Sequence, residues 1–209
     1  MTDKTVGAGP RACPENYRRS IRLKEYDYSQ AGGYFITICT YNCRYLFGNI
    51  IKEKMRLNIY GKTVMECWND IPEHFDNIML DEYVVMPNHA HGIIMIVEKG
   101  DVGATRRVAP TKITTIRPNT IGSIIGQIKS ITTKKIRNGG MKSFRWQRNY
   151  WEHVIRNEVK LFKIRQYIQN NPLKWHLDRE NPERVGVDIL EVEIFSSRRI
   201  LKGTSSNKC

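Results

Sequence analysis

Residues 83–97 read YVVMPNHAHGIIMIV and contain the clearest pair of predicted strands in the chain. Glu82–Met86 predicts a strand that stops at Pro87, and Ala90–Glu98 predicts a second strand that is apolar on both faces. Strands that are apolar on both faces are typical of the centre of a sheet. The Pro87-Asn88 turn joins the two strands, so the sequence predicts a hairpin in the middle of a sheet.

The elements around this hairpin follow from periodicity and from chain breakers. Another strand is expected at Tyr34–Tyr41, and Ser143–Ile155 is expected to be irregular or a short strand. Apolar residues recur at helical spacing in three segments, 64–75, 121–137 and 158–170. The order is strand, helix, strand, strand, helix, short strand, helix. It predicts an α+β fold with a small antiparallel sheet and helices packed on one side, as in ferredoxin-like folds.

The length of 209 residues indicates one domain with a tail, although two small domains would also fit. We expect a basic N-terminal arm at residues 1–30, the main domain at 31–176, and a partly mobile C-terminal extension at 177–209. An exposed loop is expected at 99–119, and a strand is possible at Val185–Phe195.

The charge is unevenly distributed. The chain has 34 Lys and Arg against 21 Asp and Glu, a net charge of +13, and residues 112–175 hold 14 basic residues but only Glu152 and Glu158 as acids. A dense basic surface attracts nucleic acid, although a solvated face that aids solubility would look the same. The longest apolar run, Ile93–Val97, is far too short for a bilayer, and residues 1–30 carry no secretion signal, so a cytoplasmic protein without membrane partner is expected. No nucleotide-binding motif is present.

His89 and His91 stand two apart at the start of a predicted strand. Side chains at this spacing lie on one face, where two imidazoles can share a divalent metal ion. Two ordinary hydrogen-bonded histidines remain the alternative.

Two tyrosines are candidate nucleophiles. Tyr167 and Asn171 are four apart and share one helix face, which suits attack on a phosphodiester if the phenolate is favoured. A half-buried structural tyrosine would show the same spacing. Tyr150 lies between Trp146 and Trp151 with arginines nearby, a mixture suited either to binding bases and phosphates or to core packing.

Four segments together resemble a known family, in the order YFITICTYNCRYLFG (34–48), YVVMPNHAHGIIMIV (83–97), WQRNYWEHVIRN (146–157) and YIQNNPLKW (167–175). They resemble the REP-associated tyrosine transposases, IS200-like members of the HUH endonuclease superfamily with a single catalytic tyrosine. The resemblance covers roughly residues 17 to 176. It implies a ferredoxin-like domain at 31–176, metal binding by His89 and His91 with Asn171 as third ligand, and Tyr167 rather than Tyr150 as nucleophile.

The resemblance implies a metal-dependent endonuclease and strand transferase that acts on single-stranded or hairpin DNA through a 5′-phosphotyrosine, with Mg²⁺ or Mn²⁺, as a monomer or homodimer. Basic side chains would hold the DNA backbone: Lys129, Lys134, Arg137, Arg145, Arg148, Arg156, Lys160 and Lys163. Two alternatives stay open, a hairpin-binding protein without cleavage and a nuclease that uses water in place of tyrosine.

Overall fold

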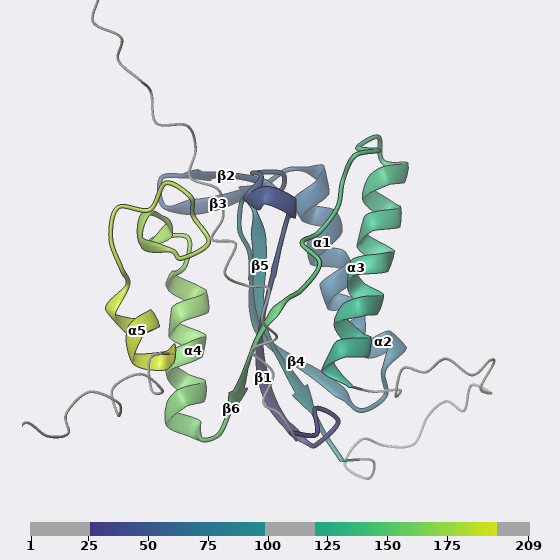
Figure 1. Ribbon diagram of the computed structural model, residues 1–209, viewed down its shortest axis with the longest axis vertical. Helices are drawn as coiled ribbons and strands as arrows, with labels where there is room; N and C mark the ends of the chain where they lie inside the picture. The colour runs from purple at the N-terminus through teal and green to yellow at the C-terminus, as the bar shows by residue number, and fades with distance from the viewer. Residues whose placement is uncertain (1–25, 99–119, 196–209) are drawn as a thin grey trace, which may run out of the picture.

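The computed structural model describes residues 26–98 and 120–195 (Figure 1). Most of the predicted arm, the predicted loop at 99–119 and the last fourteen residues of the predicted extension, 196–209, lie outside the described residues. No helix within the described ranges is long and apolar enough to cross a membrane.

A four-stranded antiparallel sheet forms the centre of the fold, in the order β4-β5-β1-β6. Its strands are β1 (Gly32–Cys39), β4 (Ile78–Val85), β5 (His89–Ile96) and β6 (Trp151–Ile155). The predicted hairpin is the β4–β5 pair, and β5 lies between β4 and β1, as its two apolar faces predicted. The α+β class and the ferredoxin-like antiparallel sheet are thereby confirmed.

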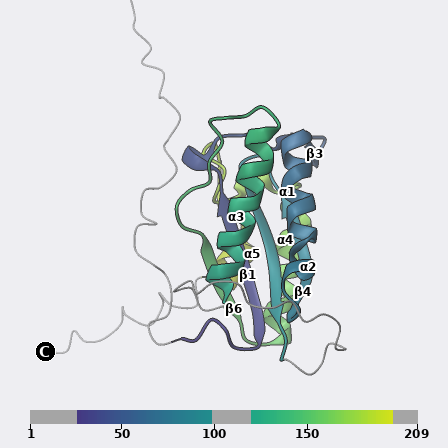
Figure 2. The same cartoon turned by 90° about the vertical axis from the view of Figure 1, so that its right-hand side faces the viewer.

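Helices α1 (Ile59–Asn69) and α3 (Ile121–Asn138) lie side by side over one face of the sheet (Figure 2). The short α2 (Ile71–His74) follows α1. The main core beneath them joins Ile36 and Ile94 of the sheet to Trp68 of α1 and Ile125 of α3. Thr120 begins α3 as a capping residue, because its hydroxyl accepts from the backbone amide of Ser123.

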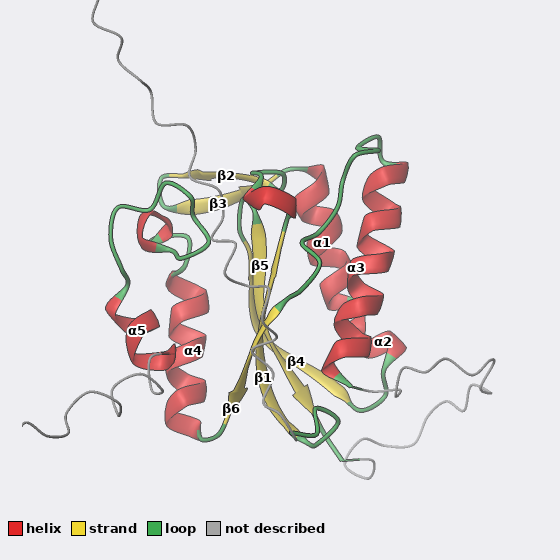
Figure 3. Cartoon of the chain, viewed as in Figure 1, coloured by secondary structure: helices red, strands yellow, loops and turns green. Residues whose placement is uncertain are grey.

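The opposite face carries α4 (Glu158–Asn170) and α5 (Ile189–Phe195) (Figure 3). Phe35 and Ile93 of the sheet pack there against Leu161 and Ile164 of α4. The prediction of helices on one side only was wrong, because α1 and α3 cover one face and α4 covers the other. The cause is visible in β1 and β5: both strands present buried side chains on both faces, and each face requires a cover.

Two local elements differ from the sequence predictions. The hairpin of β2 (Gly48–Ile51) and β3 (Lys54–Leu57) was not predicted, because its turn residues Lys52 and Glu53 adopt positive φ angles of 50° and 61° without the usual glycine or asparagine. The possible strand at Val185–Phe195 is helix α5 instead. Its start is fixed by Asp188, whose carboxylate accepts from the amide of Leu190 at 3.0 Å.

Candidate active site

The histidine pair stands at the start of β5 and faces α4. In the sheet register His89 lies opposite Cys39 and His91 opposite Thr37, and the two imidazole centroids are 4.2 Å apart. Both rings are buried, with relative exposures of 0% and 1%. The spacing of two therefore places both rings side by side, as the sequence predicted.

Neighbouring side chains fix how the two rings are oriented. Asn88 donates through Nδ2 to the carbonyls of Cys43 and Glu180, so its Oδ1 must face Nδ1 of His89, at 2.8 Å. An amide oxygen only accepts, which puts the proton of neutral His89 on Nδ1 and leaves a lone pair on Nε2. Nδ1 of His91 lies 2.8 Å from the hydroxyl of Thr37. Such partners on the outer nitrogen are typical of histidines that bind metal through the other one.

Helix α4 places Tyr167 and Asn171 at the same cluster. Tyr167 lies on the buried face of the helix, and its ring centroid is 5.4 Å from that of His91. Asn171 follows one turn later as the helix C-cap and is buried as well. The structure thus brings together the four residues that the resemblance singled out, two from β5 and two from the end of α4.

Asp178 is the residue that sequence reasoning missed. It follows the short 3₁₀ helix η3 (Trp175–Leu177) and is only 2% exposed. Its Oδ2 accepts from the phenol of Tyr167 at 3.3 Å and from Nδ2 of Asn171 at 2.5 Å. No spacing pattern in the sequence indicates Asp178, because a turn residue beyond the last long helix has no periodic relation to the strands.

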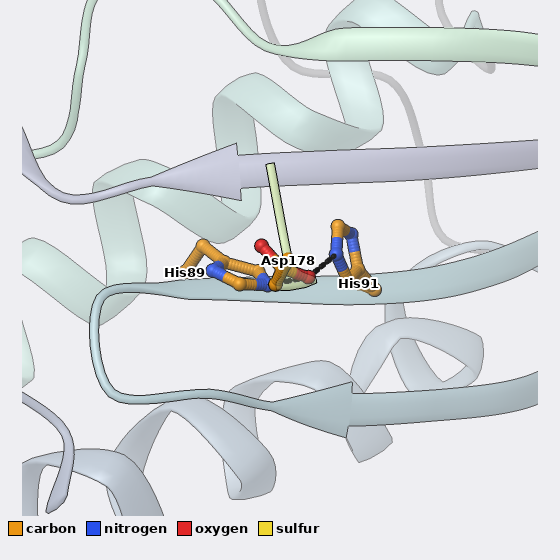
Figure 4. A group of neighbouring side chains, drawn as sticks. All are labelled: His89, His91 and Asp178. Atoms are coloured by element: carbon orange, nitrogen blue, oxygen red, sulfur yellow. Dashed lines mark ion pairs between the residues drawn. The ribbon is translucent and has the colours of Figure 1, made fainter. Parts of the chain in front are cut away.

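The carboxylate of Asp178 also faces both histidines (Figure 4). Its Oδ2 lies 3.6 Å from Nε2 of His91 and 4.0 Å from Nε2 of His89. Neither Nε2 atom has a hydrogen-bond partner, although both are buried. The three ligand atoms lie within 4.8 Å of one another, so His89, His91 and Asp178 form a group that can hold a metal ion. Two imidazoles and a carboxylate are a common ligand set for a first-row divalent cation.

The predicted third ligand, Asn171, lies beside this group. Its amide nitrogen is engaged by Asp178, and its Oδ1 is buried without a partner. An orphaned amide oxygen is the kind of atom that a hard cation accepts. Asn171 therefore stays a candidate ligand next to Asp178.

Burial sets the protonation of the cluster. Desolvation lowers the pKa of His89 to about 3, and the neighbouring His91 contributes to this shift. Burial opposes ionisation of Asp178, yet the two histidines and the Asn171 donor hold its pKa below the ordinary range. Burial, and then the charge of Asp178, raise the pKa of the Tyr167 phenol well above 10. At neutral pH the cluster thus combines a neutral His89 and a protonated phenol with an anionic carboxylate, the state in which the site can accept a cation.

The segment after α4 closes the site. Phe195 of α5 packs against Tyr167 and Phe35, with ring centroids 5.9 Å and 5.4 Å away. The carbonyl of Glu180 accepts from Asn88, and Asn181 accepts from the hydroxyl of Tyr45. Tyr167 is only 2% exposed, so a large ligand could reach its hydroxyl only if this segment moved.

The rival Tyr150 lies elsewhere. It is partly buried against the main core of α1 and α3, and it lines a small cavity together with Gln147 and Trp151. The tyrosine that contacts His91 is Tyr167.

The eight basic residues expected to hold DNA fall into two groups. Three have their ammonium groups engaged by the protein: Lys129 with the carbonyls of Gln147 and Asn149, Lys160 with the carbonyl of Ile194, and Lys163 with Glu193. Burial also lowers the pKa of Lys129 to about 8. The other five are exposed to solvent: Lys134, Arg137, Arg145, Arg148 and Arg156.

The chain has relatives among known proteins. A Haemophilus influenzae protein described only as uncharacterized is 45% identical over 167 residues, which cover 78% of this chain and 93% of that protein. A second Haemophilus influenzae protein, described as "Putative REP-associated tyrosine transposase", is 26% identical over 162 residues, 76% of each chain. The solved structure of a REP-associated tyrosine transposase bound to a REP hairpin shares the fold, with a TM-score of 0.50 and 21% identity over 74% of each chain. No family model matches the chain.

The antiparallel sheet carries a buried His-His-Asp cluster that can hold a metal ion, and the chain shares its α+β fold with the solved transposase. More narrowly, the chain is related to the REP-associated tyrosine transposases of the IS200-like family.

Proposed function

We propose that this protein is a metal-dependent endonuclease and strand transferase that cleaves single-stranded DNA next to a hairpin through a 5′-phosphotyrosine at Tyr167. One observation carries the proposal: the phenol of Tyr167, both histidines and Asp178 form a single buried cluster. The hairpin as substrate is suggested by the solved relative, which binds a REP hairpin.

The chemistry follows from the positions of the side chains. A bound Mg²⁺ or Mn²⁺ at His89, His91 and Asp178 would polarise the scissile phosphate. The phenol oxygen of Tyr167 attacks phosphorus and its proton passes to a carboxylate oxygen of Asp178. The bond from phosphorus to the 3′ oxygen breaks, and the leaving oxygen takes up this proton from Asp178. The products are a 5′-phosphotyrosine and a strand with a free 3′-hydroxyl.

Strand transfer is the reverse of this step. A 3′-hydroxyl attacks the phosphotyrosine, the phosphodiester forms again, and Tyr167 recovers its proton. The phosphotyrosine bond retains the energy of the cleaved phosphodiester, so joining the strands needs no nucleoside triphosphate. This agrees with a sequence that carries no nucleotide-binding motif.

The test is a covalent adduct assay. Hairpin DNA with a single-stranded flank is labelled at its 3′ end, because the fragment joined to tyrosine keeps that end, and is incubated with Mg²⁺ or Mn²⁺. We expect a labelled protein band with the wild type and with Tyr150→Phe, and none with Tyr167→Phe or after chelation. A band that persists in Tyr167→Phe would refute the proposal.

A second function is favoured by the closure of the site. Because Tyr167 and both histidines are buried, a protein that binds hairpins without cutting them would show the same structure. In the adduct assay such a protein binds the DNA but gives neither adduct nor cleaved strand. Cleavage without adduct indicates a nuclease that activates water.

A further inference from the structure

Asn88 completes a ring of contacts on one side of the candidate metal site. Its Oδ1 faces Nδ1 of His89 at 2.8 Å, and its Nδ2 donates to the carbonyl of Glu180 at 2.7 Å. The backbone amide of Glu180 donates to Oδ1 of Asp178 at 2.7 Å, and Oδ2 of Asp178 lies 4.0 Å from Nε2 of His89. We term this circuit of four residues the Asn88 ring. It connects one candidate ligand to another through a side chain that is not a ligand itself.

The amide group of Asn88 is fixed in one orientation. The residue is 0% exposed, and its Nδ2 also donates to the carbonyl of Cys43 at 3.2 Å, in the short 3₁₀ helix η2 (Tyr41–Cys43). Two carbonyls therefore use the hydrogens of the amide, and a flipped amide would place its oxygen against both of these acceptors. Asn88 thus presents its oxygen to His89 as a fixed acceptor.

This acceptor decides which nitrogen of His89 can bind a metal. A carboxylate accepts hydrogen bonds, so Asp178 favours a proton on Nε2 of His89, which faces its Oδ2. A proton in that position would occupy the lone pair that a metal requires. The oxygen of Asn88 holds the proton on Nδ1 instead and leaves Nε2 free.

The other half of the Asn88 ring positions Asp178. This residue begins a turn at residues 178–181, which we term the Asp178 turn and which the hydrogen bond from the amide of Asn181 to the carbonyl of Asp178 closes. Asn88 holds the carbonyl of Glu180, and the amide of Glu180 holds Oδ1 of Asp178. The remaining oxygen, Oδ2, then faces the histidines. The position of this oxygen therefore depends on the order of the turn.

We propose that Asn88 is a positioning residue that couples metal binding to the order of the Asp178 turn. The inference rests on the proposed function for the metal that His89, His91 and Asp178 would hold. These ligands come from β5 and from the turn, so a metal bound to all three restrains the turn. Linkage is reciprocal, and an ordered turn therefore strengthens metal binding by the same factor.

Thr37 provides a matched comparison in the same site. Its hydroxyl lies 2.8 Å from Nδ1 of His91, and the residue is buried, as Asn88 is. Among the described residues, the Thr37 side chain forms no hydrogen bond with the Asp178 turn. Removal of either side chain takes a partner from the outer nitrogen of one histidine, but only removal of Asn88 also releases the turn.

The test combines calorimetry with hydrogen exchange. Metal-free wild type, Asn88→Ala and Thr37→Val are titrated with Mn²⁺, and mass spectrometry follows amide exchange at residues 178–181 with and without saturating Mn²⁺. Asn77→Ala is the control for loss of a buried asparagine, because Asn77 precedes β4 and lies outside the ring. Circular dichroism confirms that each variant is folded.

We expect saturating Mn²⁺ to slow exchange in the Asp178 turn of the wild type on the order of tenfold. Asn88→Ala should raise the dissociation constant for Mn²⁺ about 10-fold to 100-fold and should lose most of the slowing at saturation. Thr37→Val should also bind Mn²⁺ more weakly, but at saturation its turn should be slowed as in the wild type. Asn77→Ala should match the wild type in both measurements.

The tautomer of His89 gives a readout that a purely structural role of Asn88 would not change. In ¹⁵N NMR spectra of metal-free protein with labelled histidine, His89 should carry its proton on Nδ1 in the wild type and in Thr37→Val. In Asn88→Ala the proton should move to Nε2. An unchanged tautomer in folded Asn88→Ala would overturn the positioning role.

Three further results would overturn the inference. The first is equal Mn²⁺ affinity of the wild type and folded Asn88→Ala, and the second is an equal loss of the slowing in Thr37→Val. The third is a wild type that binds no Mn²⁺, or whose turn exchanges at the same rate with and without saturating Mn²⁺. This last measurement needs no variant, so it decides the matter even where Asn88→Ala fails to fold.

The two proposals fail separately. If the wild type forms no covalent adduct with DNA but Mn²⁺ slows exchange in the turn through Asn88, the proposed catalysis is wrong and the coupling stands. If the wild type forms the adduct but exchange in the turn does not respond to Mn²⁺, the coupling is wrong and the catalysis stands.

Discussion

Nε2 of His91 lies 3.6 Å from Oδ2 of Asp178, which joins the central strand of the sheet to the turn that follows the last long helix. The same oxygen accepts from Tyr167 and Asn171. One carboxylate therefore links the candidate ligands to the candidate nucleophile. Its removal should affect metal binding before it affects the fold of the sheet.

Asp178→Asn should weaken binding of Mn²⁺, because a neutral amide replaces the anionic ligand between two imidazoles. We expect the dissociation constant to rise about 10-fold to 100-fold in isothermal titration calorimetry with metal-free protein. The control is Asp188→Asn, which also neutralises a buried aspartate but one that is paired with Lys174. Equal affinities of wild type and Asp178→Asn would contradict a role of this carboxylate as ligand.

The stability of the metal-free protein should fall in acid because of His89. Its pKa is about 3 in the folded state and about 6.5 when unfolded, so between these values only the unfolded chain takes up the proton. The contribution of neutral His89 is complete above about pH 6.5 and diminishes as the pH falls toward about 3. The resulting decrease in the free energy of unfolding is on the order of 2–4 kcal/mol.

The measurement compares the free energy of unfolding of the wild type and of His89→Gln at about pH 4 and at about pH 7, on either side of the pKa of an unfolded histidine. The difference between the two proteins should shrink in acid, since the variant lacks the group that titrates. The exposed His74 supplies the control, because His74→Gln leaves the buried histidine pair intact and should keep the loss of stability in acid. A constant difference between wild type and His89→Gln would show that His89 titrates normally.

Much of the site could be predicted from the sequence because its two halves obey simple periods. His89 and His91 share a strand face at a spacing of two, and Tyr167 and Asn171 share a helix face at a spacing of four. The apolar pattern of Ala90–Glu98 also predicted where the histidine strand lies in the sheet. What brings the two halves together is the packing of α4 against Phe35 and Ile93, which no local period contains.

The unpredicted part is the segment after α4. Asp178 lies in a turn, and the helix α5 is short and rich in β-branched residues, which suggested a strand. Its docking explains why Lys160 and Lys163 bind Ile194 and Glu193 in the folded chain, although both lie on the polar side of α4 and looked available for DNA. Such tertiary contacts depend on the whole fold rather than on neighbouring residues.

Weakening the contact of α5 should speed adduct formation if the proposed function holds. Ile194 is buried in the core beneath α5 with Tyr167, so Ile194→Ala removes apolar packing that keeps the segment closed. If the free energy that holds α5 docked falls by about 2 kcal/mol, the fraction of molecules with α5 undocked rises by about tenfold or more. The initial rate of adduct formation should rise by the same factor.

The control is Glu193→Gln, which breaks a half-exposed ion pair with Lys163 in the same helix. Exposed ion pairs contribute roughly 0–1 kcal/mol to stability. The initial rate of adduct formation of this variant should therefore stay within a few-fold of that of the wild type. Both variants are compared at equal DNA concentration in the adduct assay. An unchanged rate in Ile194→Ala would mean that opening of this segment does not limit the reaction.

The tight approach of the histidine strand to α1 gives a test of the fold itself. Gly92 lies between His91 and Ile93, and a Cβ added to it would come 2.2 Å from Cζ2 of the buried Trp68. Gly92→Ala should therefore lower the free energy of unfolding by about 2 kcal/mol or more, because Trp68 and the strand must separate. At Gly126 in α3 no atom lies within 4 Å of an added Cβ. Gly126→Ala should therefore raise the free energy of unfolding by about 0.5–1 kcal/mol, because alanine has the higher helix propensity. Urea unfolding of the two variants measures both changes, and a stable Gly92→Ala protein would show that α1 does not pack on β5 as closely as the structure has it.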